Sequence, residues 1–414
     1  MSAEQPPPAG PVRLYGPQFR NDPAGLYRQI RQQYGPVAPV LLEGDIPAWF
    51  VSGYREVDQV ANDSQLFTRE NQRWNAWDRI PDDWPLFAYV VDSPSVMFTE
   101  GPAHRQRADA ISDALAAVDQ FELGAQCEQI ADELIDEFAG TGEADLMAQY
   151  AEQIPLRASA AMFGMSADDA TGLLRDIAVS VDSAGEDSLD AYERMQDAMQ
   201  QLVEDRRQVP GPDVPSRLLE HPANLADQEI VLDLLVILSV AHQPTSNWIG
   251  NSVRLMLTDT RFAATLSGGR GTAGQALDEV LWEDTPTQNS IPRIATRDTQ
   301  LGGQRIRARD LLVLGLTAAN ADPHVRRDAD GAAGNRAQMS FSHGEHGCPY
   351  PAPELAEVIA KTSVEVLLDR LPDLTLAVPA GSLEWRPSVW VRGLTSLPVT
   401  FTPVPRRDRG PARP

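Results

Sequence analysis

Cys348 is the residue whose type and setting most clearly predict chemistry. It lies in the Gly-rich segment 341–356 (FSHGEHGCPYPAPELA), which runs into an expected helix. Glycines allow backbone amides to approach the sulfur, and those amides, with the positive end of the helix, would stabilise a thiolate. A thiolate is a nucleophile and a metal ligand. The alternative is that Cys348 is a small buried hydrophobe, as most free cysteines are.

The second cysteine, Cys127, favours that alternative. It lies on the amphipathic run that ends at Phe138, so we expect it in the core. Two cysteines this far apart argue against a disulfide framework and against an all-cysteine metal site. Only Cys348 is therefore a candidate for chemistry.

The elements that would position Cys348 are mostly helices. Residues 39–51 alternate apolar and polar side chains around Gly44-Asp45, which predicts a β-hairpin, and a helix should follow at 54–62. A strand-rich patch is expected at 294–316. Helical periodicity dominates between residues 104 and 369, with amphipathic runs at 120–139, 153–163, 191–206 and 228–257. The predicted fold class is mainly α with small β-sheets.

Composition favours one large domain at residues 13–402, between a flexible Pro-rich start (1–12) and a flexible tail (403–414). The most apolar stretch, 230–241, contains Asp233 and ends too early to span a bilayer. The N-terminus lacks the features of a signal peptide, so we expect a cytoplasmic protein that does not bind membranes. We also expect a monomer.

The overall charge argues against nucleic acids as partners. The chain has a formal net charge of -24 and a pI near 4.6. Such a surface repels a phosphate backbone. We therefore expect no nucleic-acid binding.

The segment around Cys348 resembles the haem-binding loop of cytochromes P450, in which Phe, Gly, His and Cys recur in this order and spacing. The resemblance implies the cytochrome P450 fold, a single domain with a long central helix over the haem. It also implies haem b as the cofactor and Cys348 as the iron ligand, whose thiolate promotes O–O cleavage. Other segments that look like bacterial members follow in register: 39–51, 139–146, 301–303, 318–323 and 392–399.

The resemblance also implies partners for the two haem propionates, which are anions and need cationic or hydrogen-bonding groups. The family usually has another arginine where this chain has Ala108, and Arg107 is a candidate replacement. Alternatively, Arg105 and Arg107 form a solvated helix face. The other residues assigned to the cofactor by the resemblance are His104, Arg293, His346 and the loop residue Phe341.

Two family motifs are altered. The Glu-x-x-Arg pair is Glu279 to Trp282 here, and Trp282 cannot form an ion pair. We expect Glu279 to find another donor or to lie near solvent, and packing to replace the whole network. A subset of actinobacterial cytochromes P450 shows the same tryptophan, so the resemblance still implies the fold and haem binding.

The oxygen-activating helix departs further, because the family pattern Ala-Gly-x-acid-Thr is Ala241 to Thr245 (AHQPT) here. Thr245 keeps the alcohol, whereas Pro244 replaces the acid and can neither carry a proton nor donate an amide. It could also kink the helix. A proton relay could use His242, Gln243 or a substrate group, which makes these two residues and Thr245 the catalytic candidates. Alternatively, His242 is a polar residue satisfied inside a distorted helix.

The substrate region implied by the resemblance is rich in aromatic residues. Trp74 and Trp77 could stack against an aromatic or peptide substrate, or they could anchor a long loop; Trp84 and Phe87 are expected to be anchors. The further candidates for the substrate pocket are Ala241, Ser290, Ile291 and Trp390.

Three functions stay open. The first is an oxidase that tailors a secondary metabolite, by oxygen insertion into a small hydrophobic molecule or by coupling aromatic groups, for example in a short peptide. The second is a haem-binding sensor without monooxygenase activity, and the third is a peroxide-driven oxidase. The expected electron donors are a ferredoxin and its reductase, which would dock near the Cys348 loop through Arg326, Arg327 and Arg336.

Overall fold

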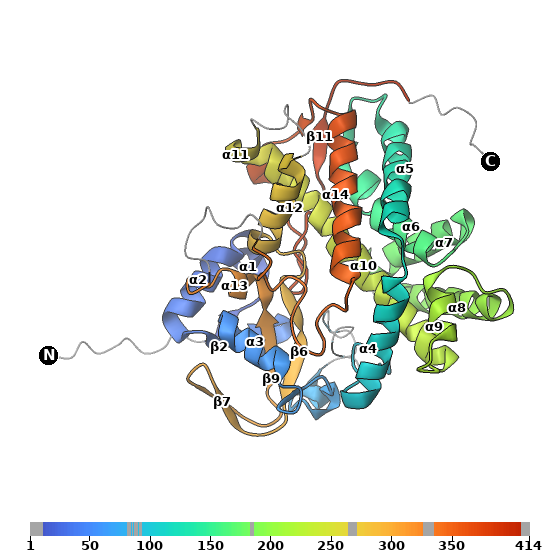
Figure 1. Cartoon of the computed structure of the whole chain (residues 1–414). Coiled ribbons are helices and arrows are strands. Elements are labelled where there is room, and N and C mark those ends of the chain that lie inside the picture. The colour runs from blue at the N-terminus through green and yellow to red at the C-terminus, as the bar shows by residue number, and fades with distance from the viewer. Residues whose placement is uncertain are drawn as a thin grey trace.

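The structure is a computed structural model, which describes residues 11–80, 84, 86, 90, 93–182, 186–263, 271–325 and 335–406. Helices make up most of it (Figure 1). Phe87, Arg326 and Arg327 lie outside the described residues. The helices are α1 (Gly16–Asn21), α2 (Pro23–Tyr34), α3 (Tyr54–Asn62), α4 (Gly101–Ala116), α5 (Gln120–Phe138), α6 (Gln153–Met162), α7 (Ala167–Asp182), α8 (Glu186–Gln208), α9 (Val214–Glu220), α10 (Asp227–Thr258), α11 (Thr260–Ala263), α12 (Gly271–Glu283), α13 (Leu316–Asn320) and α14 (Ala352–Arg370).

Small sheets complete the fold, so the predicted class is confirmed. A six-stranded sheet has the order β1-β2-β3-β9-β6-β4, and the predicted hairpin is its antiparallel pair β2–β3, which turns at Gly44. A three-stranded sheet has the order β10-β11-β5, and β7 pairs with β8. The strands are β1 (Val12–Arg13), β2 (Val37–Leu42), β3 (Ile46–Val51), β4 (Phe67–Thr68), β5 (Glu143–Asp145), β6 (Asn289–Ala295), β7 (Thr299–Leu301), β8 (Gln304–Ile306), β9 (Leu311–Gly315), β10 (Thr375–Leu376) and β11 (Pro398–Thr400).

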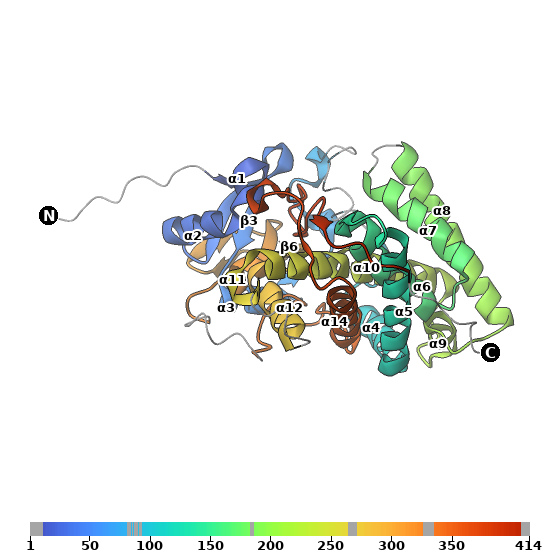
Figure 2. The same ribbon diagram turned by 90° about the horizontal axis from the view of Figure 1, so that it is seen from above.

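The central helix α10 packs against α6, α8, α12 and α14 and runs through the middle of the molecule (Figure 2). Its first turn carries Asp227 and Glu229, which favour a helix N-terminus electrostatically, and the Glu229 carboxylate accepts a hydrogen bond from the Ala226 amide at 2.9 Å. Pro244 lies inside the helix and does not end it.

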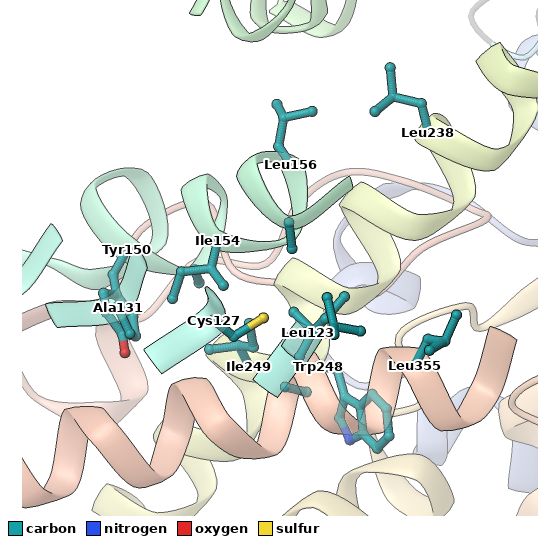
Figure 3. Packing of buried hydrophobic residues seen from close by; sticks show 14 of the residues in the cluster. Leu123, Cys127, Ala131, Tyr150, Ile154, Leu156, Leu238, Trp248, Ile249 and Leu355 are labelled. Atoms are coloured by element: carbon teal, nitrogen blue, oxygen red, sulfur yellow. The ribbon is translucent and has the colours of Figure 1, made fainter. Parts of the chain in front are cut away.

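The largest hydrophobic cluster lies between α5, α6, α10 and α14 (Figure 3). Cys127 is fully buried in it, and burial raises the pKa of the Cys127 thiol to about 12, so the core interpretation is confirmed. Among the helices of the described ranges, none combines the length and apolar character that a bilayer crossing requires.

Candidate haem-binding site

The loop that carries Cys348 is held by its own backbone. The Cys348 amide donates to the Phe341 carbonyl at 2.9 Å, and the Gly347 amide donates to the Gly344 carbonyl at 2.9 Å. Gly344 has a φ of 75°, and a Cβ there would meet the Ala61 carbonyl oxygen at 2.1 Å. Only glycine lets the loop approach the end of α3 this closely.

The loop also contacts the central helix. The ring of Phe341 meets the indole of Trp248 edge to face, with centroids 6.0 Å apart. Trp248 lies on α10 within one turn of Thr245. Phe341, which the sequence assigned to the cofactor loop, therefore joins that loop to the helix of the catalytic candidates.

The electrostatic setting of Cys348 favours the neutral thiol while no metal is bound. The residue is exposed to solvent, yet the surrounding protein desolvates its sulfur. Burial, and secondarily the charge of Glu354, raise the pKa of the Cys348 thiol to about 12. A bound metal cation would offset this desolvation and favour the thiolate, and stabilisation of the thiolate by the loop amides and the start of α14 stays a prediction.

A cluster of basic side chains lies near this loop. The rings of His104 and His346 are 3.9 Å apart between centroids, and His346 Nε2 lies 3.3 Å from a Glu100 carboxylate oxygen. Arg293 on β6 is fully buried, and burial lowers its pKa to about 10. Burial, followed by the charges of Arg69 and Arg293, holds the pKa of His346 well below its usual range.

Arg69 belongs to this cluster and was missed in the sequence. Strand β4 pairs antiparallel with β6, with Phe67 opposite Ala295 and Thr68 opposite Ile294, so the next residue, Arg69, faces Arg293. Burial and the charge of Arg293 lower the pKa of Arg69 well below its usual range. No local sequence pattern marks this arginine, because its position depends on a two-residue strand.

These side chains have buried polar atoms that the protein leaves without a partner, and the two arginine nitrogens among them are donors. Among the described residues, Arg69 Nε, Arg293 Nη2 and His346 Nδ1 are buried and have no hydrogen-bond partner. Two buried guanidinium groups repel each other, the nearby charge of Glu100 offsets this only in part, and each unpaired donor costs free energy. An anion with several acceptor oxygens would relieve both costs, and a haem propionate has this chemistry. The residues therefore fit a haem.

His104 makes different contacts from those expected. Its Nδ1 lies 2.9 Å from the Val96 carbonyl oxygen, and its Nε2 lies 2.9 Å from the Glu345 carbonyl oxygen. Both ring nitrogens thus already face backbone acceptors. His104 connects the start of α4 to the Cys348 loop, and its role toward a propionate stays a prediction.

The expectation for Arg107 needs correction. The residue is 2% exposed, and its guanidinium forms a bidentate ion pair with Asp233 of α10, with Nε–Oδ2 at 2.8 Å and Nη2–Oδ1 at 2.5 Å. Nη1 donates to the Pro94 carbonyl at 2.6 Å. Arg107 is therefore neither on a solvated face nor available to a propionate, since the ion pair and this carbonyl occupy its donors.

The Arg69 assignment gives a prediction. We expect Arg69→Met to speed haem transfer to apomyoglobin about tenfold, because one charge-assisted hydrogen bond contributes roughly 1.5 to 3 kcal/mol. Arg73→Met is the matched control, since Arg73 is half-exposed and pairs with Glu70 on the surface. Equal transfer rates for both variants would remove Arg69 from the site.

The catalytic candidates lie on a stretch of α10 that is accessible although the helix is mostly buried on either side of it. Residues 239–244 are half-buried or exposed, with Val240 45% exposed, whereas Thr245 is buried. His242 Nε2 lies 3.0 Å from the Glu152 carbonyl oxygen. Pro244 has no amide hydrogen to give to the Val240 carbonyl, but α10 continues to Thr258. Gln243 and Ala241 are half-buried on the same stretch.

The altered Glu-x-x-Arg region is tied together by hydrogen bonds. Glu279 is buried, so it does not lie near solvent. Trp282 is also buried, and its indole donates to the Asn335 carbonyl at 3.1 Å. Asn320 and Ser340 both donate to the Leu281 carbonyl, at 3.0 and 2.6 Å. These bonds connect the end of α12 to the segment before the Cys348 loop.

The substrate candidates separate into two groups. Trp74 is 1% exposed and packs against Trp84, with centroids 6.0 Å apart, in the same hydrophobic cluster as Trp390. This placement favours an anchoring role for Trp74. Trp77 and Ile291 are half-buried and Ser290 is buried, and their contact with substrate stays a prediction.

Comparison with known proteins finds relatives over nearly the whole chain. No protein-family model matches the chain. The chain is 28% identical over 404 residues to vitamin D(3) 25-hydroxylase of Pseudonocardia autotrophica, covering 94% of this chain and 96% of the relative. It is 29% identical over 390 residues to mycinamicin IV hydroxylase/epoxidase of Micromonospora griseorubida, covering 91% and 95%.

Solved structures show the same fold. CYP154C4 from Streptomyces sp. W2061 superposes with a TM-score of 0.83 at 27% identity, covering 94% of this chain and 98% of that one. Haem is the cofactor of these proteins, and they are oxidoreductases that act with O2. On the combined grounds of the Cys348 loop, the basic cluster, the fold and these relatives, the chain belongs to the cytochrome P450 superfamily.

Proposed function

We propose that this cytochrome P450 tailors a secondary metabolite by coupling aromatic groups, with an aromatic small molecule or short peptide as its substrate. The observation that carries the proposal is the accessible stretch of α10, where Pro244 replaces an acid and the ionisable residue His242 lies two positions earlier. Without that acid, proton delivery to bound oxygen lacks its usual donor. Coupling still needs protons for O2, which His242, Gln243 or a substrate group would relay, but it transfers no oxygen atom to the substrate.

The relatives support both this proposal and its alternative. One is biflaviolin synthase CYP158A1 of Streptomyces coelicolor, 28% identical over 415 residues, covering 97% of this chain and 98% of the relative. Several others are named hydroxylases. Hydroxylation of a small hydrophobic molecule is therefore the second candidate function.

In this proposal, different residues bind the iron, the propionates and the electron donor. Cys348 would ligate the iron, and Arg69, Arg293 and His346 would hold the propionates. When bound, the haem supplies the oxidant by activating O2. Electrons would come from a ferredoxin and its reductase, docking near the Cys348 loop; Arg336 is exposed there and lies 3.4 Å from Glu357.

Mass spectrometry of the products tests the proposal. The holoenzyme, a surrogate ferredoxin pair and O2 are incubated with tripeptides containing tyrosine or tryptophan and with simple phenols. In coupling, two substrate X–H bonds break and one C–C or C–N bond forms, while O2 takes up the two substrate hydrogens, two donor electrons and two protons from solvent and becomes two waters. We thus expect products that have lost two hydrogens.

Three other outcomes would contradict coupling. Products that gain one oxygen atom would favour the hydroxylase. Turnover with peroxide and none with the ferredoxin pair would indicate a peroxide-driven oxidase. Ligand binding with no product from any substrate would favour the sensor.

A further inference from the structure

The hydrogen bond from His242 fixes which of its ring nitrogens is available. A carbonyl oxygen only accepts, so the Nε2 that faces Glu152 O at 3.0 Å carries the hydrogen in the neutral ring. Nδ1 is then an acceptor with a free lone pair. Among the described residues, no partner of Nδ1 is found, and the ring lies on the accessible stretch 239–244.

The charged groups around His242 keep the ring neutral. Arg386, from the C-terminal segment, forms an ion pair with the Glu152 carboxylate, while the Glu152 carbonyl holds the ring. Burial lowers the pKa of His242, the hydrogen bond to Glu152 opposes this, and the nearby positive charge of Arg386 lowers it further. At neutral pH the ring therefore presents an acceptor and no positive charge.

We propose that His242 Nδ1 accepts a hydrogen bond from an O–H or N–H group of the substrate, and so selects phenols, indoles and related donors. Such a site discriminates strongly, because a bound substrate without the donor would exclude water from Nδ1 and leave that acceptor unpaired. The inference rests on the proposed function, whose aromatic substrates carry these groups. It adds the atom that would recognise them.

Binding of a matched pair of probes tests this assignment. We expect the wild-type holoenzyme to bind 4-phenylphenol about tenfold more tightly than its methyl ether, because one hydrogen bond contributes about 1.5 kcal/mol. The ratio should fall to about one in His242→Phe and recover partly in His242→Gln, whose amide oxygen can accept. Equilibrium dialysis gives the dissociation constants.

Ser239→Ala is the control on the same accessible stretch. Its hydroxyl donates back to the Leu235 carbonyl at 2.8 Å, so its loss should leave the tenfold ratio unchanged. A thiolate spectrum of the reduced protein with carbon monoxide confirms that each variant is folded and holds haem. Equal binding of both probes by the wild type, or an unchanged ratio in His242→Phe, would overturn the assignment.

The pH dependence gives a second readout. The preference for the phenol should disappear as the pH falls through the pKa of His242, because a protonated Nδ1 can no longer accept. Arg386→Gln removes the nearby cation, so the loss should begin at a higher pH. A preference that does not change with pH in either protein would also overturn the assignment.

The two proposals can fail separately. Coupled products without a phenol preference would refute the role of His242 and leave coupling intact. A phenol preference with only oxygenated products would refute coupling and leave His242 in place.

Discussion

Cys348→Ala is expected to abolish the thiolate spectrum of the reduced protein with carbon monoxide and to reduce turnover to background. The reason is that the loop offers one sulfur, on the open side of a backbone held by Phe341 and Gly344. Alanine cannot ligate iron. The basic cluster can still bind the propionates, so some haem should remain bound with an altered spectrum.

The second cysteine gives the control for this result. Cys127 is fully buried in the main core, so Cys127→Ala should keep the thiolate spectrum and lower the free energy of unfolding by roughly 1 kcal/mol. A Soret position typical of histidine ligation in the wild type, or a thiolate spectrum that persists in Cys348→Ala, would contradict the assignment.

The helices could be predicted because their periodicity is strong and local. Residues 120–139 and 228–257 were predicted as amphipathic helices, and α5 (Gln120–Phe138) and α10 (Asp227–Thr258) match them within one residue at each end. The hairpin around Gly44 was likewise set by local alternation and a turn. In each case one short window contains the whole signal.

The site was only partly predictable, because its contacts join distant segments. Cys348, Arg293 and His346 followed from a resemblance in register. Arg69 meets Arg293 only through the pairing of a two-residue strand, and no window of the sequence contains both. The raised pKa of Cys348 likewise depends on atoms packed around the sulfur, which loop spacing does not specify.

Arg107 shows how a local argument can fail. Its helical position suggested either a propionate partner or a solvated face, since both follow from spacing along one helix. Its actual partner, Asp233, lies 126 residues away on α10 and is fully buried. The acid in the most apolar stretch of the chain was visible in the sequence, and it marks a buried ion pair, because an isolated buried carboxylate is too costly.

The largest stability effect is expected from breaking this pair. Asp233→Ala leaves the Arg107 guanidinium buried without its carboxylate and removes the acceptor of the Val96 amide, which lies 2.7 Å from Asp233 Oδ1. We expect the free energy of unfolding to fall by about 3 to 5 kcal/mol, the usual result of removing one partner of a buried pair. Urea unfolding followed by circular dichroism measures it.

A double variant separates the charge from the packing. Arg107→Met combined with Asp233→Leu removes both charges and keeps apolar volume, so it should recover more than half of the loss. Asp45→Asn breaks a pair with Arg13 in which both side chains are more than half exposed, and it should leave the urea midpoint unchanged. If the double variant were as unstable as Asp233→Ala, lost packing and not the unpaired charge would explain the loss of stability. The ion pair would then not be the interaction that holds α4 against α10.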